Sequence, residues 1–405
     1  MQTGDLKLVK SINDRLVLNL IRVNKVMSSS ELVRITGMRP STIFNILKDM
    51  AAQSLVLNLG KGESTDKGGK KPYLWSLNNE AAYALGVDVE VGELTAVILD
   101  FSAEIVAKKI YRIDKFETID ELVHHILVIV DDILTESGID RSKVIGLGVG
   151  IAGVVNAESG HVVMTDVFQE MNVPVLDALK NHYSFPVAIE NNANAAAVGD
   201  KWVGAARESR NSMTVLVEFD RNVHGFGIGV IVNEELYRGS SYCAGELNLP
   251  MSDLGEMLTN VRSMLRIGPI LSKFDGSPIS VDTRIMIDAA RQGDPAAISF
   301  FNRLGSFIGK RISSVIGVLN PDMLIISGDL AELQDLIISP VKNAIEMETL
   351  SITSEVLKVA TSSHGHYSVA MGAASIILES HFKVPDVRSL NSVVGNGFGG
   401  RTVEI

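Results

Sequence analysis

The sequence is poor in cysteine and in long apolar runs, and both shortages exclude whole classes of protein. Cys243 is the single cysteine among 405 residues, which rules out an internal disulfide and any zinc site made of several thiolates. No apolar run reaches the ~18 residues that span a bilayer, and the N-terminus has no secretory leader. We therefore predict a cytoplasmic protein without a metal site, in which Cys243 is a small buried residue.

Composition and charge divide the chain. With 46% hydrophobic and 21% charged residues it has an ordinary globular composition, and its length predicts two or three domains. Residues 1–79 contain 12 basic and 6 acidic side chains, a formal +6, whereas the whole chain carries −11, which leaves −17 on residues 80–405. A basic end on an acidic body predicts that residues 1–79 alone bind a polyanion.

The basic end has the pattern of three short helices. Apolar residues recur at helical spacing from Leu6 to Val23, and Ser28 and Glu31 have the spacing of a capping box that opens a second helix. That helix stops at Gly37, and Pro40 suits the first turn of a third helix. A helix, a short turn with glycine and another helix form the helix-turn-helix arrangement, whose second helix reaches DNA bases.

Two short strands follow, Leu55–Asn58 and Tyr73–Leu77, around the polar stretch Gly60–Pro72. They predict a β-wing that contacts phosphates or a minor groove. With residues 1–79 as a winged helix-turn-helix domain, we expect DNA to be bound by exposed residues at the turn, on the third helix and on the wing: Arg39, Pro40, Ser41, Thr42, Asn45, Lys48, Lys67, Lys70 and Lys71.

The acidic body alternates strands with long helices. Buried-strand runs occur at Ala84–Val89 and Leu94–Leu99, a helix is expected from Thr118 to about Ser137, and another strand at Val144–Leu147. This alternation predicts an α/β fold whose sheet is covered on both faces. Gly148–Gly153 satisfies G-x-G-x-x-G, but no helix start follows it, so we interpret it as a structural turn and not a dinucleotide loop.

A polar break in the body carries the candidate binding chemistry. The strand at Val187–Ile189 ends in Glu190-Asn191-Asn192-Ala193-Asn194 and then enters an alanine-rich helix, so side chains at the break can project into a cleft. Taken alone, an asparagine cluster is also typical of a turn or a helix cap. The choice between these readings depends on the rest of the chain.

The whole pattern resembles the ROK family of repressors, open reading frames and sugar kinases, up to about Leu378. The break resembles the family's sugar-binding Glu-Asn-Asp-Ala-Asn, and Gly68-Gly69-Lys70-Lys71-Pro72 resembles a motif in the wing of its repressors, of the xylose and N-acetylglucosamine type. The resemblance implies an actin-like body of two lobes, with lobe 1 at 80–186 and lobe 2 at 187–384. We expect the C-terminal helix to complete lobe 1 and residues 385–405 to form a flexible tail.

The resemblance also implies sites that have changed. The family's catalytic aspartate is replaced by Asn192, which cannot accept a proton near neutral pH. The family's Asp-x-Gly-Gly-Thr phosphate loop is Asp88-Val89-Glu90-Val91-Gly92 here, where Glu90 repels phosphate, and its second loop is His224–Gly227. We expect no catalytic residue, no cofactor and no metal, because Leu249 replaces a zinc-ligating histidine and the family's cysteine loop is missing.

The expected protein is thus a DNA-binding transcriptional regulator, a repressor of carbohydrate metabolism with an inactive sugar-kinase-like sensor. Its partners would be operator DNA, a monosaccharide and a second copy of itself, because operators usually have two half-sites. The residues expected to hold the sugar are Asn172, Glu190, Asn191, Asn192 and Glu246. Two alternatives remain open: a regulator controlled by a protein partner or by no small ligand, and an active sugar kinase with an extra domain.

Overall fold

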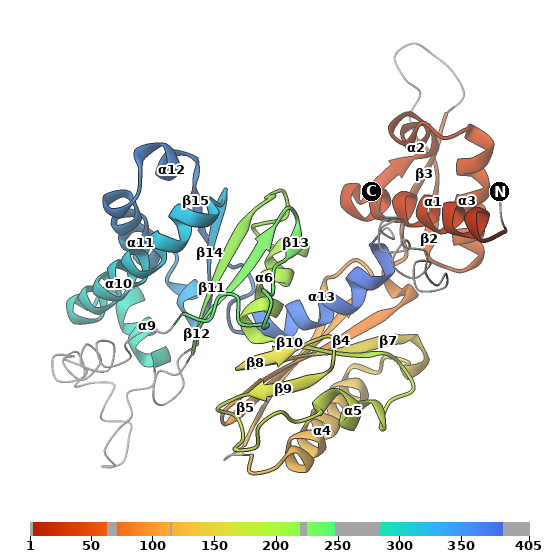
Figure 1. Ribbon diagram of the computed structural model, residues 1–405. Helices are drawn as coiled ribbons and strands as arrows, with labels where there is room; N and C mark the ends of the chain where they lie inside the picture. The colour runs from red at the N-terminus through yellow and green to blue at the C-terminus, as the bar shows by residue number, and fades with distance from the viewer. Residues whose placement is uncertain (1–2, 63–70, 114–115, 219–224, 248–282, 384–405) are drawn as a thin grey trace, which may run out of the picture. The chain divides into compact units, whose positions relative to one another are not determined.

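The computed structural model describes residues 3–62, 71–113, 116–218, 225–247 and 283–383. Contacts divide the chain into two units (Figure 1). The first comprises Met1–Ala81 with Leu378–Ile405, and the second comprises Ala82–Ile377. Among the described residues, no helix combines the length and apolar character that crossing a membrane requires.

The first unit has the expected three helices and hairpin. Its elements in chain order are α1 (Thr3–Asn24), β1 (Val26–Ser28), α2 (Ser29–Thr36), α3 (Pro40–Ala52), β2 (Val56–Lys61) and β3 (Tyr73–Leu77). The strands form an antiparallel sheet in the order β1-β3-β2. The first unit also contacts the residues after Leu378: Arg15 donates a hydrogen bond to the carbonyl of Lys383 at 2.7 Å, and the Arg22 guanidinium lies over the ring of Phe382.

Local chemistry fixes the helix-turn-helix. The Ser28 hydroxyl accepts from the Glu31 amide at 3.1 Å, and the Glu31 carboxylate accepts from the Ser28 amide at 2.8 Å, which is the predicted capping box. The Ser28 backbone hydrogen bond lowers the pKa of Glu31. Gly37 ends α2 in the left-handed conformation at φ 67°, where a side chain would be strained, so the chain can turn directly into α3.

The first sheet of the second unit is mixed, in the order β10-β7-β4-β5-β6. Strands β4 (Tyr83–Glu90), β7 (Val144–Ile151) and β10 (Val187–Asn191) are parallel, while β5 (Glu93–Asp100) and β6 (Ile105–Arg112) continue the sheet antiparallel. Helices α4 (Ile119–Ser137) and α5 (Val175–Lys180) cover one face, and α13 (Ser368–Phe382) covers the other (Figure 1). A hairpin of two short strands follows β7 and consists of β8 (Val154–Asn156) and β9 (His161–Met164). Two 3-10 turns precede β4 and β7: η1 (Asn79–Ala81) and η2 (Arg141–Lys143).

Glycines in this sheet bring α13 unusually close. A Cβ atom on Gly86 would lie 1.9 Å from the Ala370 carbonyl oxygen, and one on Gly148 would lie 1.9 Å from that of Ala373. The glycine run is therefore not the turn that we predicted. Gly148 and Gly150 lie within β7 and serve close packing, and the chain turns only at Ala152 and Gly153.

The second sheet has the order β13-β12-β11-β14-β15. Its strands are β11 (Ser212–Glu218), β12 (Gly225–Val232), β13 (Glu235–Leu236), β14 (Met323–Gly328) and β15 (Lys358–Thr361). Helix α6 (Asn192–Trp202) packs on β11 and β12 and links the two sheets. The other helical elements are α9 (Thr283–Arg291), α10 (Pro295–Leu319), η3 (Asp329–Leu333), α11 (Asp335–Glu348), α12 (Ser351–Val356) and η4 (Gly365–Tyr367).

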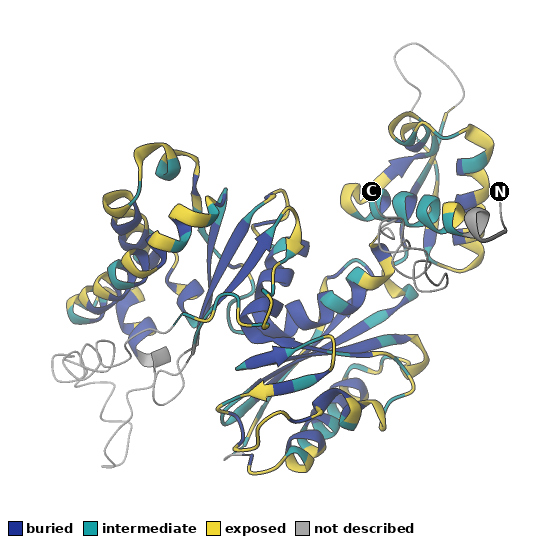
Figure 2. Ribbon diagram, viewed as in Figure 1, coloured by how far each residue is buried: buried dark blue, intermediate teal, exposed yellow. Residues whose placement is uncertain are grey.

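Two apolar cores match the two sheets. One lies between the first sheet and α4, and the other between the second sheet and α9, α10 and α11. Figure 2 shows the buried residues concentrated in the strands and on the helix faces toward them. The predicted fold class, an α/β body of two lobes that follows N-terminal helices in the chain, is confirmed.

Candidate functional site

The polar break lies where β10 ends and α6 begins. Asn191 caps α6, because its side-chain oxygen accepts from the Asn194 amide at 3.0 Å. All three asparagines of the break, Asn191, Asn192 and Asn194, are buried. Asn191 can therefore both cap α6 and take part in a binding site, because the cap uses only its side-chain oxygen.

The side-chain nitrogen of Asn191 lies close to Glu246. The Asn191 amide nitrogen donates to the Gly153 carbonyl at 2.7 Å and lies 3.4 Å from a Glu246 carboxylate oxygen. Glu246 belongs to the loop after β13, so the two predicted ligand residues come from opposite sheets and meet. The Glu246 residue remains exposed, while desolvation around its carboxylate raises its pKa. An amide and an accessible carboxylate side by side are suited to hydrogen bonding the hydroxyls of a polyol.

Glu190 is held by donors of the chain itself. Arg238 approaches one of its carboxylate oxygens through Nη2 at 2.7 Å and Nε at 2.8 Å. The side-chain nitrogen of Asn194 and the backbone amide of Asn191 both donate to the other oxygen at 3.1 Å. The carboxylate is 2% exposed, so these donors supply the partners that a buried charge requires. Our sequence reasoning missed Arg238, whose contact with Glu190 joins residues 48 positions apart.

The remaining two predicted ligand residues lie differently. Asn192 is buried, and its side-chain oxygen accepts from the Ala193 amide at 2.9 Å. Asn172 is exposed and has a left-handed backbone conformation at φ 55°. Its backbone amide donates to the Val163 carbonyl. Within the described ranges, no hydrogen bond joins Asn172 to Asn191 or Glu246.

A second contact between the lobes borders this site. Tyr242, in the loop that carries Glu246, hydrogen bonds Glu158 in the β8–β9 turn, and this bond raises the pKa of Tyr242. Its neighbour Cys243 is exposed, so our prediction of a buried cysteine was wrong. The loop lies at the surface because it connects an edge strand, and small size alone did not place the thiol in the core.

A separate charged cluster occupies the ends of β4 and β5. Nε2 of His366 lies 2.7 Å from Glu93, and Nδ1 lies 3.5 Å from Asp329. Burial alone would lower the pKa of His366, but hydrogen bonds to Asp329 and Glu93 outweigh it and raise the pKa to about 10. The imidazole is therefore a cation at neutral pH.

Asp88 lies beside this cation in the interior. Burial, followed by the charge of Glu90, raises the pKa of Asp88 well above its ordinary value, and its Oδ1 atom has no hydrogen-bond partner. The cluster thus combines four carboxyl groups with one imidazolium. Among the described residues, no group of histidine, cysteine, aspartate and glutamate side chains has a metal-binding arrangement.

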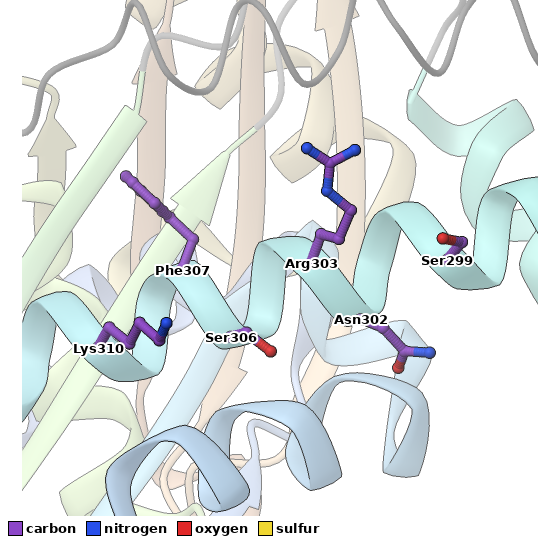
Figure 3. A pocket seen from close by; sticks show the side chains of 6 residues that line it. All are labelled: Ser299, Asn302, Arg303, Ser306, Phe307 and Lys310. Carbon is purple, nitrogen blue, oxygen red and sulfur yellow. The ribbon is translucent and has the colours of Figure 1, made fainter. Parts of the chain in front are cut away.

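The face of α10 forms a shallow hollow of about 420 Å³ (Figure 3). Arg303 and Phe307 project from one side of the helix, and Asn302 from the other. This hollow contains none of the residues predicted to bind DNA or sugar. Its lining consists of Ser299, Asn302, Arg303, Ser306, Phe307 and Lys310.

In the first unit, α3 presents a polar face. The predicted stripe of Ile43, Ile46, Leu47 and Met50 is buried, which leaves the predicted DNA-binding side chains outside. Thr42 is half-buried, and the exposed ones are Arg39, Pro40, Ser41, Asn45 and Lys48. Phe44 shares this face and is 65% exposed, which we did not predict. Its position three residues after Ser41 could have indicated it, since that spacing returns to one helix face.

The wing is described only in part. Its hairpin pairs β2 with β3 antiparallel, and Lys71 is exposed two residues before β3. Lys67 and Lys70 lie outside the described residues. Their contact with DNA stays a prediction.

The sequence profile of the ROK family matches residues 84–253 and 269–380. The chain belongs to the ROK family. It is 25% identical over 395 residues to the xylose repressor of Bacillus subtilis (strain 168), a match that covers 94% of this chain and 98% of that protein. It is 22% identical over 397 residues to the DNA-binding transcriptional repressor Mlc of Escherichia coli (strain K12), covering 93% and 95%.

Solved structures show the same fold. A ROK family transcriptional regulator, described as a homolog of E. coli Mlc, superposes with a TM-score of 0.70 at 20% identity, over 93% of this chain and 97% of that one. A ROK family glucokinase from Streptomyces griseus, in complex with glucose and AMPPNP, superposes with a TM-score of 0.64 at 21% identity. The match covers 73% of this chain and 99% of the glucokinase chain.

Proposed function

We propose that this ROK-family chain is a sequence-specific DNA-binding regulator, a repressor of carbohydrate metabolism, whose ROK body senses a carbohydrate without phosphorylating it. One observation carries the proposal: a polar, exposed face on α3 is fused to a ROK body that has Asn192 in the place of the catalytic base. Each half has a use in this function. A kinase would need no exposed polar face on α3, and it would need a base at the position of Asn192.

The DNA-binding half is supported by charge and by geometry. The module of residues 1–79 is formally +6, which favours a polyanion. Pro40 starts α3 directly after the Arg39 turn, so Ser41 and Asn45 lie near the N-terminal end of the helix, the end that meets base edges in helix-turn-helix proteins. Asparagine pairs well with adenine, and an exposed aromatic such as Phe44 can contact a thymine methyl group.

The loss of catalysis is supported at two places. The Asn192 amide cannot take a proton from a sugar hydroxyl near neutral pH. In addition, Glu90 and Glu93 lie near Asp88, the residue aligned with the family's phosphate loop, and Asp329 contacts the neighbouring His366. These carboxyl groups would repel the γ-phosphate and its neighbours, and His366 neutralises only part of their charge.

The sensing role is supported by Asn191 and Glu246. They are hydrogen-bonding groups from opposite sheets, and Glu246 remains open to solvent. A ligand that bridges them would favour one arrangement of the lobes, which is the requirement for changing DNA affinity.

A regulator controlled by a protein partner is the second candidate. It is favoured by Glu190, whose carboxylate is fully occupied by Arg238, Asn194 and Asn191 and so offers a sugar no free acceptor. Under this alternative Asn191 and Glu246 would be structural only. A monosaccharide screen by thermal shift separates the two, because a ligand bound by the folded state alone raises the midpoint.

The deciding experiment selects binding sites from random duplex DNA with the full-length protein. We expect an enriched motif, and we expect Asn45→Ala to lose preference at one position within it. The control is Asn181→Ala, an exposed asparagine on the second unit, which should leave the motif unchanged. Failure to enrich any sequence at moderate salt would remove the DNA-binding proposal.

A further inference from the structure

Helix α13 has a part in each unit of the chain. Residues 368–377 belong to the second unit, and residues 378–382, which continue the same helix, belong to the first. The helix contains no proline, and its one glycine, Gly372, lies in the part that belongs to the second unit. A helix of 15 residues spans ~22 Å. One stiff element is thus shared between the two units.

In the second unit, α13 contacts α6 backbone to backbone (Figure 1). A Cβ atom on Gly372 would lie 1.8 Å from the Ala195 carbonyl oxygen, and one on Gly199 would lie 3.0 Å from the Gly372 Cα atom. Alanines of α6 also form one apolar cluster with Val369 and Ala373 of α13. Because a close-packed interior leaves little room to yield, a shift of α6 must carry this part of α13 with it.

Helix α6 begins in the candidate ligand site. Asn191, whose side-chain nitrogen lies 3.4 Å from Glu246, caps its first turn. The start of α13 has a second connection, because η4 directly precedes it and His366 in η4 links the two sheets. The second-unit end of α13 is therefore tied both to a predicted ligand residue and to the junction of the lobes.

In the first unit, the other end of α13 is fixed to α1. The Arg15 guanidinium donates at 2.7 Å to the Lys383 carbonyl, which lies at the end of the helix, where carbonyls lack an amide partner within the helix. The carbon of the Arg22 guanidinium lies 5.5 Å from the centre of the Phe382 ring. Leu378 and Phe382 are 0% and 2% exposed, so this end is packed. Helix α1 in turn packs on α3, which carries the polar face of the module.

We propose that α13 transmits the state of the ligand site to the DNA-binding module, with Gly372 as its joint to α6 and Phe382 as its joint to α1. The inference rests on the proposed function, because it describes how a ligand held at Asn191 changes DNA affinity. Gly372 and Phe382 are positioning residues, since they act through α6 and α1. A displacement of α6 moves α13 as one body, and the far end of α13 then shifts α1 and with it α3.

Hydrogen exchange of the full-length protein with and without DNA tests the proposal. The probe is the duplex enriched by the selection experiment. Coupling is reciprocal, so DNA bound at α3 must act on α6 through the same helix. We expect amides of residues 192–202 and 369–377 to change their exchange rates by at least ~5-fold, the lower end of ordinary coupling, while amides of α11 stay unchanged. Equal changes throughout the chain, or none in α6, would overturn the proposal.

Variants at the α1 joint separate transmission from stability. Phe382→Ala removes the ring below Arg22 and should abolish the response of α6 to saturating DNA, whereas Phe382→Leu keeps an apolar contact and should retain it. The matched control is His381→Ala, an exposed neighbour in the same turn, which should respond like the wild type. If Phe382 only stabilises the first unit, the alanine variant binds DNA more weakly but keeps the response at saturation, and the proposal fails.

The wild-type comparison does not depend on how the variants fold, and it separates two kinds of failure. A wild-type protein that binds no duplex would refute the proposed function, and this inference with it. Binding of the duplex without a response in α6 would refute the inference alone and leave the DNA-binding function in place.

Discussion

The imidazole Nε2 of His366 lies 2.7 Å from a carboxylate oxygen of Glu93. Glu93 begins β5 of the first sheet, and the other contact of His366, Asp329, follows β14 of the second sheet. His366 thus links the two sheets, with one carboxylate partner on each side.

This arrangement predicts a dependence of stability on alkaline pH. The folded-state pKa of His366 is about 10, above the ordinary 6.5, so its contribution is complete below about pH 6.5 and is lost as pH rises toward 10. Replacing it by glutamine should lower the free energy of unfolding at pH 7 by on the order of 2 kcal/mol and flatten its decline up to pH 10.

Urea denaturation at several pH values measures both effects. The matched control is His182→Gln, an exposed histidine, which should leave the profile unchanged. The neighbouring carboxyl groups Asp88, Glu90, Glu93 and Asp329 remain in both variants. A His366→Gln profile parallel to that of the wild type would contradict the prediction.

Asp200 is a second buried group with a raised pKa, which keeps this side chain neutral instead of charged. Burial raises the pKa of Asp200 to about 7, although hydroxyls of Ser362 and Thr214 donate to it at 2.7 and 3.2 Å. The folded state therefore keeps a proton that the unfolded state loses above about pH 4, and the free energy of unfolding should fall as pH rises from 4 to 7. Asp200→Asn should remove this fall and be more stable than the wild type at pH 8.

Comparison with Asp200→Ala provides the control. Alanine leaves both hydroxyls without an acceptor and opens a cavity, so it should destabilise the protein at every pH. If the asparagine variant keeps the wild-type slope between pH 4 and 7, titration of another group is responsible.

The sequence was sufficient where structure is local or periodic. Ser28 and Glu31 predicted a cap that forms as expected, and the buried stripe of α3 followed from spacing alone. The covered sheets followed from strands alternating with helices. These features depend on neighbours within a few residues, or on one repeated face.

Contacts between distant residues were not predictable in the same way. Arg238 and Glu190 are 48 positions apart, and His366 and Glu93 are 273 apart, so no spacing rule connects them. Nothing in the sequence around His366 indicates these contacts, yet the fold places Glu93 and Asp329 against its ring. Similarly, the exposure of Cys243 and Phe44 depends on which elements pack over them, which their residue types do not determine.

Phosphate transfer should be absent with ATP and common hexoses, pentoses or amino sugars, measured against a ROK glucokinase as positive control. Asn192→Asp restores a base but leaves Glu90 and Asp329 beside the phosphate position, so this change alone should not create a kinase. Turnover above a buffer blank in the wild type that is lost in Glu246→Ala would show that the site is catalytic after all.

DNA binding should separate into two classes of side chain. Replacing Lys67, Lys70 and Lys71 together by alanine should weaken specific and non-specific DNA alike and reduce the salt slope by about one unit per lost phosphate contact. Phe44→Ala should instead alter preference at a thymine while leaving the slope unchanged. Lys180→Ala, on the exposed side of α5, serves as the charge control. An unchanged slope in the triple variant would remove the wing from the interface.

The site formed by Asn191 and Glu246 should bind a monosaccharide and thereby change operator affinity. The sugar can act only through a difference in its affinity for two lobe arrangements, and a difference of about 1–3 kcal/mol changes operator affinity ~5–150-fold. Linkage requires operator DNA to change sugar affinity by the same factor, so calorimetric titration of sugar with and without DNA measures one quantity twice. Glu246→Ala should abolish sugar binding, whereas Glu158→Ala, at the rim, should weaken it less. If a sugar binds with equal affinity in both states, the site is not a sensor, and control by a protein partner becomes the better account of this body.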